Sequence, residues 1–444
     1  MSSTGQWGDP LAGRFTLPLT PEIANTGMTP TLDTQCKPSP GALPGDPGSV
    51  REPMDSTYTV ETARSLADLL HLREAWQEMS RDANGDLDFF LTVNRSQSEV
   101  QRPHVISVKQ GGAVKAILVA RIDKRPLDVA VGYKKLSSPP VRFLSVVYGG
   151  VLGDVSEEIA ALLVESVQEA LRSREADVAL FHALDDDSAL HRILKKAGNL
   201  LTRDYCPAIL RRWATRLPGS YEEFLKARSS NTRHNAKRYS KKFQTAFEGQ
   251  SEIRIYCDPA DIETMLSHTE MVASKTYHRG LGVGFVNNEL MRNISTLAAA
   301  KGWLRAYVLY VRGEPAAFWN GWLYRRTFFA WTTGYLPELH DYRAGTFLLQ
   351  KMFADLCAGK MADEVNFGFG DAQYKRDWSD HDQSQVSVLL FAPTVKGVSL
   401  NLVRTPLVAA SSMAHSILAR TDLLQKIKKA WRNRAAKVAA PISS

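Results

Sequence analysis

Hydrophobic and polar residues follow two spacings along this chain, one typical of strands and one of helices. In the first half, short apolar runs and period-two alternation predict strands at residues 59–61, 104–108, 114–122, 143–148, 178–182 and 208–212. Apolar residues at helical spacing predict helices from Ser65 to about Trp76 and over residues 157–174 and 188–197. The first half therefore mixes helices with a sheet whose central strands are joined by helical crossovers.

The second half repeats this order of elements. The pattern predicts helices at 221–247, 261–275 and 346–358, and strands at 252–256, 303–311, 314–323, 326–334, 364–369 and 385–391. Two tight turns, Arg312-Gly313 and Tyr324-Arg325, join the three consecutive strands. Both halves thus follow one αβ plan, and we expect a duplicated α/β (α+β) fold. We place the linker near residues 212–220, between domains at 57–214 and 215–395.

The two ends of the chain differ from this body. Residues 1–56 hold nine of the 21 prolines and seven glycines without apolar periodicity, which predicts a disordered Pro/Gly-rich tail. Residues 396–444 form a C-terminal extension, in which 421–438 read as a basic amphipathic helix. Such a helix is attracted to anionic lipid, so peripheral contact with a membrane is one expectation. Docking on the protein itself or on a partner is the alternative.

Composition places the chain among ordinary globular proteins. Of its 444 residues, 44% are hydrophobic and 23% charged, and four isolated cysteines offer neither a disulfide framework nor a zinc site. The N-terminus lacks a secretion signal, and no run of about 18 apolar residues predicts a membrane span. We therefore expect a cytoplasmic protein without a metal. The net charge of +8 is local: residues 226–242 carry seven basic groups and no acid, and the last 30 residues carry seven against one.

The first segment with candidate chemistry is the loop at residues 340–346, which delivers a helix N-terminus to the edge of a sheet. The amide groups and the dipole of such a terminus attract an anion, and Gly345 lets a phosphate approach the backbone. Arg343 could add a bidentate contact. The alternative is that Gly345 and Thr346 simply begin a helix. The loop lacks an intact (Q/R)-x-x-G-x-(G/A) pattern, because residues 343–346 offer one glycine.

The second segment is residues 365–378, where a strand runs into Gly368 and Gly370, then an acid, then an aromatic–lysine pair. Lys375 could neutralise a phosphate or a developing oxyanion, and Asp371 could orient or deprotonate an attacking amine or hydroxyl. Because they lie four residues apart, the same two side chains could instead form a surface ion pair of little energetic weight.

The order of these segments carries a family resemblance. The matching stretches are residues 221–225, 233–242, 303–309, 312–317, 334–335, 343–349 and 367–375. Together they resemble the GNAT-like acyltransferases of the CelD/BcsL type, named for cellulose biosynthesis and related to the Fem-type aminoacyl transferases. The resemblance covers roughly residues 58–395 and is strongest over 215–380. That family usually shows Ser-Pro-Gly where this chain has Arg343-Ala344-Gly345, and residues 374–378 look like the aromatic-Lys-x-x-aromatic segment of the Fem-type enzymes.

The resemblance implies tandem GNAT-like acyl-CoA N-acyltransferase domains with mixed central sheets flanked by helices. The first domain would be non-catalytic, and the second would use acyl-CoA (acetyl-CoA) as donor. Residues Arg343, Ala344, Gly345 and Thr346 would then hold the donor phosphates. Lys375, Asp371, Tyr374 and His278 would be catalytic, with Lys375 on the oxyanion and Asp371 or His278 on the acceptor proton. The acceptor would be a small molecule or saccharide of polysaccharide or cell-envelope metabolism.

Several other residues are candidate substrate contacts: Arg233, Arg238, Tyr277, Arg279 and Tyr335. The basic residues of 226–242 form either a solvated helix face or a charged rim that gathers a polyanionic substrate. Tyr239 and Phe243, four apart, are predicted to be core contacts. Two further functions stay open: Fem-type transfer from aminoacyl-tRNA, and a non-catalytic module that binds an anionic polymer or membrane.

Overall fold

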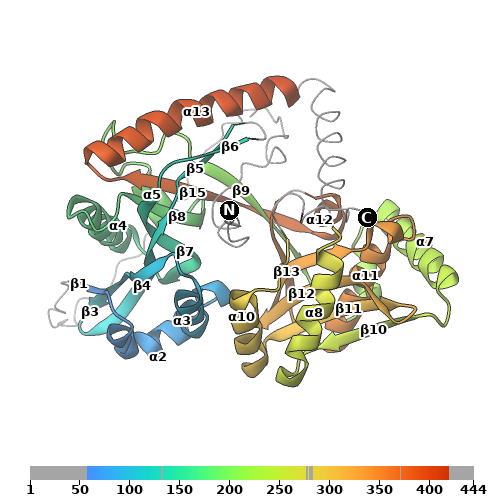
Figure 1. Ribbon diagram of the computed structural model, residues 1–444. Coiled ribbons are helices and arrows are strands. Elements are labelled where there is room, and N and C mark those ends of the chain that lie inside the picture. Colours follow the sequence, from blue (N-terminus) through green and yellow to red (C-terminus); the bar gives the residue numbers. More distant parts are fainter. Residues whose placement is uncertain (1–57, 132–133, 277–278, 280–283, 371, 420–444) are drawn as a thin grey trace, which may run out of the picture.

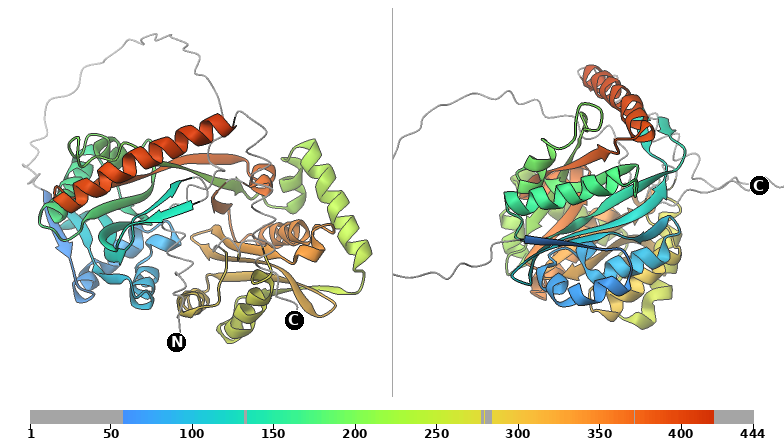
Figure 2. Two further views of the ribbon diagram at one scale, coloured as in Figure 1. Left: turned by 45° about the horizontal axis from the view of Figure 1, so that its top comes forward. Right: turned by 90° about the vertical axis from the view of Figure 1, so that its left-hand side faces the viewer.

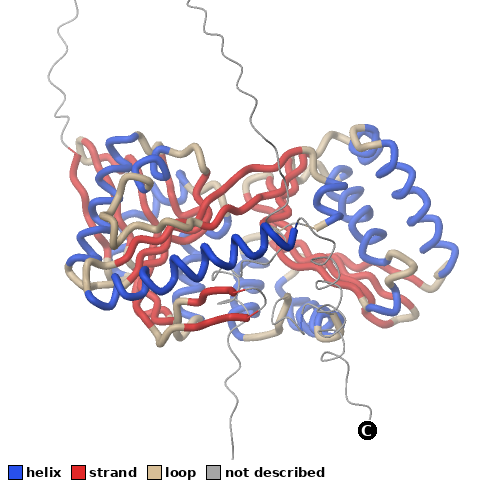
Figure 3. Tube along the Cα trace, turned by 90° about the horizontal axis from the view of Figure 1, so that it is seen from above, coloured by secondary structure: helices blue, strands red, loops and turns tan. Residues whose placement is uncertain are grey.

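One mixed β-sheet of 13 strands runs through the molecule and is covered by helices. The computed structural model describes residues 58–131, 134–276, 279, 284–370 and 372–419, so the predicted tail at 1–56 and the predicted helix at 421–438 lie outside it. Along the sheet the strands follow the order β1-β3-β4-β7-β8-β15-β9-β14-β13-β12-β11-β10, with β2 paired to β4. The first and second halves of the chain lie side by side (Figure 1), and their strands form one continuous layer seen from above (Figure 3).

The first half of the chain supplies most of one side of the sheet. Its strands are β1 (Tyr58–Ala63), β2 (Val100–Pro103), β3 (Val105–Gln110), β4 (Ala113–Arg125), β5 (Asp128–Val131), β6 (Lys134–Ser137), β7 (Val141–Gly153), β8 (Val178–Asp185) and β9 (Ala208–Arg216). Its helices are η1 (Ala67–Leu72), α2 (Arg73–Met79), η2 (Ala83–Gly85), α3 (Leu87–Ser96), α4 (Glu157–Arg172) and α5 (Ala189–Leu194). β5 and β6 pair as a separate two-stranded sheet.

The second half supplies the other side. Its strands are β10 (Ser251–Tyr256), β11 (Leu304–Val311), β12 (Glu314–Tyr324), β13 (Thr327–Tyr335), β14 (Glu364–Phe369) and β15 (His381–Phe391). Its helices are α6 (Tyr221–Lys226), α7 (Ser230–Ala246), η3 (Pro259–Asp261), α8 (Ile262–Ala273), α10 (Glu289–Ala300), η4 (Pro337–Leu339), α11 (Ala344–Ala358), α12 (Gln373–Trp378) and α13 (Val395–Ala419).

Each half follows the same pairing plan, which confirms the expected duplicated α/β fold. In the first half β3, β4 and β7 pair antiparallel, and α4 carries the chain from β7 to the parallel strand β8. In the second half β11, β12 and β13 pair antiparallel, and α11 carries the chain from β13 to the parallel strand β14. Each of these two helices connects a pair of parallel strands, because a helical crossover returns the chain in the same direction. α4 and α11 therefore occupy equivalent positions.

The two halves exchange one strand each. β9 comes from the first half but pairs with β14 of the second, and β15 comes from the second half but pairs with β8 of the first. β9 and β15 also pair with each other, from Ala208↔Ser387 to Ala214↔His381. The predicted linker at 212–220 is wrong at its start, because residues 212–216 lie inside β9 and hydrogen-bond between two neighbours. The predicted division between residues 214 and 215 falls within the same strand.

Apolar side chains fill a core on each side of the joint. In the first half, Leu163 and Val167 of α4 pack on Leu118, Leu144 and Phe181 of the sheet. In the second half, Leu348, Met352 and Phe353 of α11 pack on Phe328 and Val365 and reach Phe224 of α6. A third cluster unites Phe89 and Val93 of α3 with α8 and α10, so the two halves share buried surface. Burial of such side chains is the main favourable term in holding the halves together.

Most predicted elements are confirmed, with several corrections. The helices α3, α10 and α13 are among the elements not anticipated from the sequence. The helix predicted over 221–247 is two helices, α6 and α7, because Ser229 begins the second and accepts a hydrogen bond from Thr232 N. The strand predicted to end at Tyr148 continues as β7 through Gly149-Gly150, where Gly149 takes a φ of +68° at a register shift. Glycine adopts such a φ without strain, so the pair bends the strand and does not end it.

α13 crosses one side of the molecule and contacts β5 and β15 (Figure 2). Its buried Arg404 donates to Asp204, 2.7 Å between Nη1 and Oδ1, and its Asn401 donates to the carbonyls of Leu201 and Arg203. Within the described residues, no helix is both long enough and apolar enough to cross a bilayer.

Candidate active site

The N-terminus of α11 lacks a side-chain cap. Its N-cap residue, Arg343, has the left-handed backbone conformation φ 59°, ψ 38° and makes no side-chain capping hydrogen bond. The first amide groups of a helix have no partner within the helix. Because no side chain caps them here, the amides of Ala344, Gly345 and Thr346 retain the positive end of the helix dipole for an anion. A non-glycine residue held at positive φ is strained, a feature concentrated at functional sites.

The equivalent helix of the first half begins in the opposite way. Ser156 is the N-cap of α4 and accepts a hydrogen bond from Ile159 N, so its side chain satisfies the first turn. Glu157 and Glu158 follow within that turn and already place negative charge at the dipole. α11 has no acidic residue in its first turn. The duplication therefore supplies an internal comparison, in which α11 suits an anionic ligand and α4 does not.

Basic and aromatic side chains of α7 surround the open end of α11. The guanidinium carbon of Arg343 lies 5.1 Å from the ring centre of Tyr239, and that of Arg238 lies 5.0 Å from the same ring. Lys242 Nζ lies 5.8 Å from the ring centre of Tyr342, the residue before Arg343. Cations over aromatic faces are attracted by the ring quadrupole. We call Arg238, Tyr239, Lys242, Tyr342 and Arg343 the cationic cluster.

Gly345 and Tyr335 meet at the edge of this cluster. A Cβ atom on Gly345 would lie 2.9 Å from Cδ1 of Tyr335, so glycine is what lets the ring pack against the first turn of α11. Tyr335 is half-buried, and burial raises the pKa of its phenol while Arg343 lowers it. The predicted donor-binding residues and the predicted substrate contact Tyr335 therefore come together in the structure.

Next to α11, the parallel strands β13 and β14 separate. They pair at three positions, Thr327↔Glu364 to Phe329↔Asn366, after which β14 continues beside β9 and β13 beside β12. Lys375 and Tyr374 stand on α12 just beyond the end of β14. The Lys375 ammonium is buried and donates to the carbonyl oxygen of Phe369, the last residue of β14.

Tyr374 is held by aromatic neighbours. Its ring makes edge contacts with Trp319, 5.5 Å between centroids, and with Phe367, 5.9 Å. Edge-to-face packing of this kind fixes the ring plane. α12 therefore presents a fixed lysine and tyrosine where the two strands separate.

The structure places the remaining predicted site residues as follows. Arg238 belongs to the cationic cluster, whereas Arg233 donates to the carbonyls of Lys226 and Arg228 and ties α7 to the end of α6. Arg279 forms an ion pair with Glu270, 2.6 Å between Nη2 and Oε1, and also donates to the Phe285 carbonyl. Tyr277, His278 and Asp371 lie outside the described residues, so their roles stay predictions.

Sequence reasoning missed part of the cluster. Phe243 is fully buried as predicted, but Tyr239 is half-buried and two guanidinium groups lie near its ring. Lys242 was predicted only as one of the basic residues of 226–242, and Tyr342 was given no role of its own. The signal was present in the chain, because Arg238, Tyr239 and Lys242 lie on one stretch of α7, but their nearness to residue 343 depends on how α7 packs on α11.

A family model matches the part of the chain that carries this site. Residues 230–376, from the start of α7 to α12, match the family model described as the acetyltransferase (GNAT) domain. No curated protein matches the sequence. The part of the second half from α7 to α12 is therefore similar to a GNAT acetyltransferase domain.

Several solved structures are similar over most of the chain. A structure titled as that of FemX has 11% identity and a TM-score of 0.48, covering 71% of this chain and 95% of its own. A tandem GNAT protein from the clavulanic acid biosynthesis pathway has 12% identity and a TM-score of 0.43, covering 76% and 99%. L-PGS from Bacillus licheniformis has 13% identity and a TM-score of 0.43, covering 76% and 96%.

Proposed function

We propose that this protein is an acyltransferase that moves an acetyl or longer acyl group from an acyl-CoA thioester to an amine or hydroxyl of a polar acceptor. The observation that carries the proposal is the contrast between the two equivalent helices. α11 is uncapped, free of acid in its first turn and flanked by Arg343, Arg238 and Lys242, whereas α4 is capped by Ser156. The GNAT match spans the same elements, α7 to α12.

The residues at α11 fit the phosphates of the donor. The amides of Ala344, Gly345 and Thr346 would donate hydrogen bonds to a phosphate oxygen, and Gly345 carries no Cβ to obstruct it. Arg343 would add a charge-assisted hydrogen bond, of the kind worth about 1.5–3 kcal/mol. Arg238 and Lys242 would raise the local concentration of an anionic donor. When bound, the donor supplies the thioester, an activated acyl carbon.

The reaction itself needs little covalent chemistry from the protein. The acceptor nitrogen or oxygen bonds to the acyl carbon, the carbon–sulfur bond breaks, and the acceptor proton ends on the released thiolate. We assign to Lys375 the stabilisation of the oxyanion, because a preorganised ammonium in a dry site is effective where negative charge develops. Its hydrogen bond to the Phe369 carbonyl would hold it in place. Asp371 and His278 remain our candidates for the proton.

The finer assignment follows the resemblance in sequence. We propose a protein of the CelD/BcsL type that works in polysaccharide or cell-envelope metabolism. Fem-type transfer from aminoacyl-tRNA is the second candidate, favoured by the aromatic-Lys-x-x-aromatic segment at residues 374–378. Both use the same group transfer to an amine or hydroxyl and differ in the donor.

Calorimetry of acetyl-CoA binding tests the donor. We expect binding to the intact protein, a loss of about tenfold or more in Arg343→Ala, and a smaller loss in Lys375→Ala, which should instead abolish turnover. Lys195→Ala removes an equal charge from an exposed site of the first half and should bind as the parent does.

Two results would count against the proposal. Absence of binding at millimolar acetyl-CoA, together with salt-dependent binding of aminoacyl-tRNA, would favour the Fem-type reaction. Binding that is equal in the parent and Arg343→Ala would show that the donor site lies elsewhere.

A further inference from the structure

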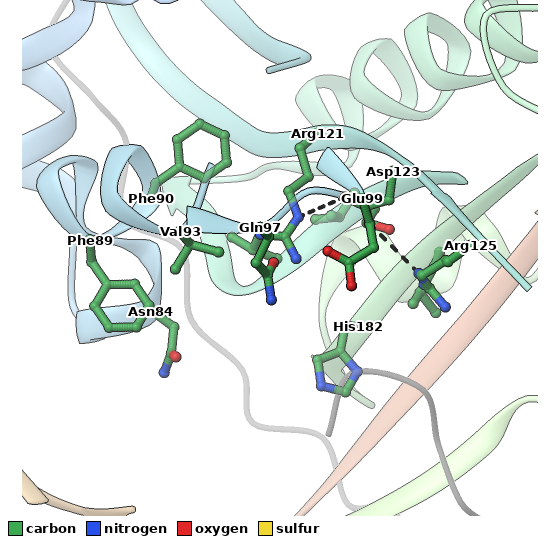
Figure 4. Close-up of a pocket in the computed structure, with 14 residues that line it drawn as sticks. Asn84, Phe89, Phe90, Val93, Gln97, Glu99, Arg121, Asp123, Arg125 and His182 are labelled. Carbon is green, nitrogen blue, oxygen red and sulfur yellow. Dashed lines mark ion pairs between the residues drawn. The ribbon is translucent and has the colours of Figure 1, made fainter. Parts of the chain in front are cut away.

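A second site lies in the first half of the chain, away from the cationic cluster. It is a pocket between α3, β4, β7 and β8 that is partly open to solvent. Figure 4 shows Phe89, Phe90 and Val93 on one side of the pocket and Arg125 and His182 on the other, with Gln97 and Glu99 between them. None of these side chains takes part in the donor site described above. The pocket therefore has an apolar end and a charged end.

The charged end is built on one face of β4. Arg121, Asp123 and Arg125 occupy alternate positions, so their side chains point the same way. Asp123 forms an ion pair with Arg121, 2.9 Å between Nε and Oδ1, and reaches Arg125 at 3.8 Å between Nε and Oδ2. All three side chains are at most 11% exposed. Two buried guanidinium groups thus share one buried carboxylate, and burial lowers the pKa of Arg125.

An unsatisfied hydroxyl faces the same space. Ser145 of β7 lies directly across from Arg121, lines the pocket and is 7% exposed, and among the described residues its Oγ has no hydrogen-bond partner. Leaving a buried hydroxyl unpaired costs about 1–3 kcal/mol. A ligand with a polar group at this position would remove that cost.

The backbone beside the pocket is also unusual. Ala183, next to the pocket residue His182, has a φ of +51° at a register shift between β8 and β15. Register irregularities of this kind re-aim side chains and occur next to binding sites. The buried His182 is neutral near pH 7, since burial lowers its pKa to about 4. His182, beside this register shift, therefore lines the pocket as a neutral imidazole and adds no charge to the pocket.

The pocket touches the candidate catalytic residues through one side chain. The ring of Phe369 contacts His182, 6.1 Å between centroids, and Tyr148, 5.1 Å. The carbonyl of the same Phe369 accepts the hydrogen bond from Lys375 Nζ. His182, which lines the pocket, therefore contacts the residue that holds the lysine we assign to the transfer.

We propose that this pocket binds the acceptor and that the acceptor is a zwitterionic amino compound with an apolar side chain, such as a free apolar amino acid. Arg121, Asp123 and Arg125 together carry a net charge of +1. The two arginines would bind the ligand's carboxylate, with Ser145 as a further hydrogen-bond donor. The half-buried Glu99 balances that charge and would bind the ammonium. Phe89, Phe90 and Val93 would enclose the side chain. The four charged groups sum to zero, as does the ligand.

The role of the ligand as acceptor rests on the proposed transferase function. Its binding to the pocket does not, because binding needs no acyl donor. Calorimetry with L-phenylalanine as probe, in the absence of acetyl-CoA, therefore tests the pocket by itself. Two analogues separate the charges: phenylalaninamide lacks the carboxylate, and 3-phenylpropionate lacks the ammonium. We expect L-phenylalanine to bind at least tenfold more tightly than either analogue.

Two substitutions assign the charges to residues. Glu99→Gln should weaken the binding of L-phenylalanine at least tenfold. The binding of 3-phenylpropionate should stay unchanged or become tighter. Arg125→Gln should weaken both carboxylates and remove the preference over phenylalaninamide. Glu158→Gln, on the exposed start of α4, is the matched control and should leave all three unchanged. Because Glu99 is half-exposed, its variant stays informative even where Arg125→Gln does not fold.

The outcomes distinguish the two proposals. The proposed ligand of the pocket would be wrong if the protein bound acetyl-CoA but not L-phenylalanine. It would also be wrong if the parent and Glu99→Gln bound the amino acid equally. Binding of L-phenylalanine without its N-acetylation on addition of acetyl-CoA would leave the binding site standing and overturn its role as acceptor site.

Discussion

At the scale of single residues, strain and close contact mark the donor site. Arg343 keeps a left-handed backbone although it has a Cβ, and Gly345 packs so closely on Tyr335 that a methyl group would collide with the ring. The sequence pointed to both positions, because an arginine and a glycine precede an apolar helix. The ring that requires the glycine lies on β13, ten residues earlier, and no spacing in the chain predicted that contact.

Gly345→Ala should separate stability from donor binding. In a helix alanine is favoured over glycine by about 1 kcal/mol, which offsets part of the collision with Tyr335, so the free energy of unfolding should change by less than about 1 kcal/mol. The displaced ring and first turn should weaken acetyl-CoA binding several-fold. Urea unfolding and calorimetry measure the two quantities.

A second change serves as the control for that collision. In Tyr335→Ala the ring is absent, so adding Gly345→Ala to it should cost no further donor affinity. If the Gly345→Ala effect is as large without the ring as with it, the Tyr335 contact does not explain the glycine.

Histidine protonation should make stability depend on pH. Burial lowers the pKa of both His104 and His182 to about 4, well below the unfolded value near 6.5. As the pH falls from 6.5 toward 4, the unfolded chain therefore takes up protons that the folded chain does not. The free energy of unfolding is thus highest above pH 6.5 and decreases below it, by up to about 3 kcal/mol per histidine.

His104→Gln isolates one of these protons. Urea unfolding measured between pH 7 and pH 4.5 should give a slope about one proton smaller than in the parent. A slope that His104→Gln does not alter would contradict the assignment.

At the scale of elements, the sequence predicted strands and helices better than it predicted their partners. Alternation within β11, β12 and β13 and the tight turns between them determine a local meander, so these were found. β9 and β15 were also found as strands, but nothing in either stretch says that each pairs across the chain, because strand pairing is a property of two distant segments. The loop at residues 340–346 was predictable for the same local reason. The pocket on β4 was not, because its lining comes from segments that are distant in the chain.

An ion pair between α13 and a residue 200 positions earlier contributes to the stability of the fold. Arg404 of α13 pairs with Asp204, whose side chain is fully buried and also accepts a hydrogen bond from Leu389 N of β15. Arg404→Met would leave that carboxylate buried without its cation, which typically costs 3–5 kcal/mol. Urea unfolding of the full chain measures the loss.

A double variant makes this prediction specific to the ion pair. Adding Asp204→Asn to Arg404→Met removes the uncompensated charge and should recover part of the stability. If the double variant is less stable than the parent by the sum of the two single losses, the two side chains do not act as a pair.

At the scale of the whole molecule, the exchange of β9 and β15 makes the two halves one folding unit. Without the second half, β8 would lose its neighbour β15, and without the first half, β14 would lose β9. Each half would then expose a hydrogen-bonding edge in what is now the middle of the sheet. The exchange also brings Phe369, at the end of β14, against His182 of β8, which is how the pocket of one half comes to lie beside the lysine of the other.

This interdependence predicts the result of cutting the chain between the halves. A protease site inserted between Pro218 and Gly219, just after β9, leaves every strand intact while dividing the covalent chain. The two pieces should remain together on gel filtration after cleavage, because β9 and β15 each stay paired in the other half's sheet. They should separate in denaturant, and neither should regain a compact state alone. As a control, the same site at Glu248-Gly249, in the turn between α7 and β10, should also leave the cut protein associated. Pieces cut after Pro218 that separate under native conditions and stay folded would show instead that each half is an independent domain.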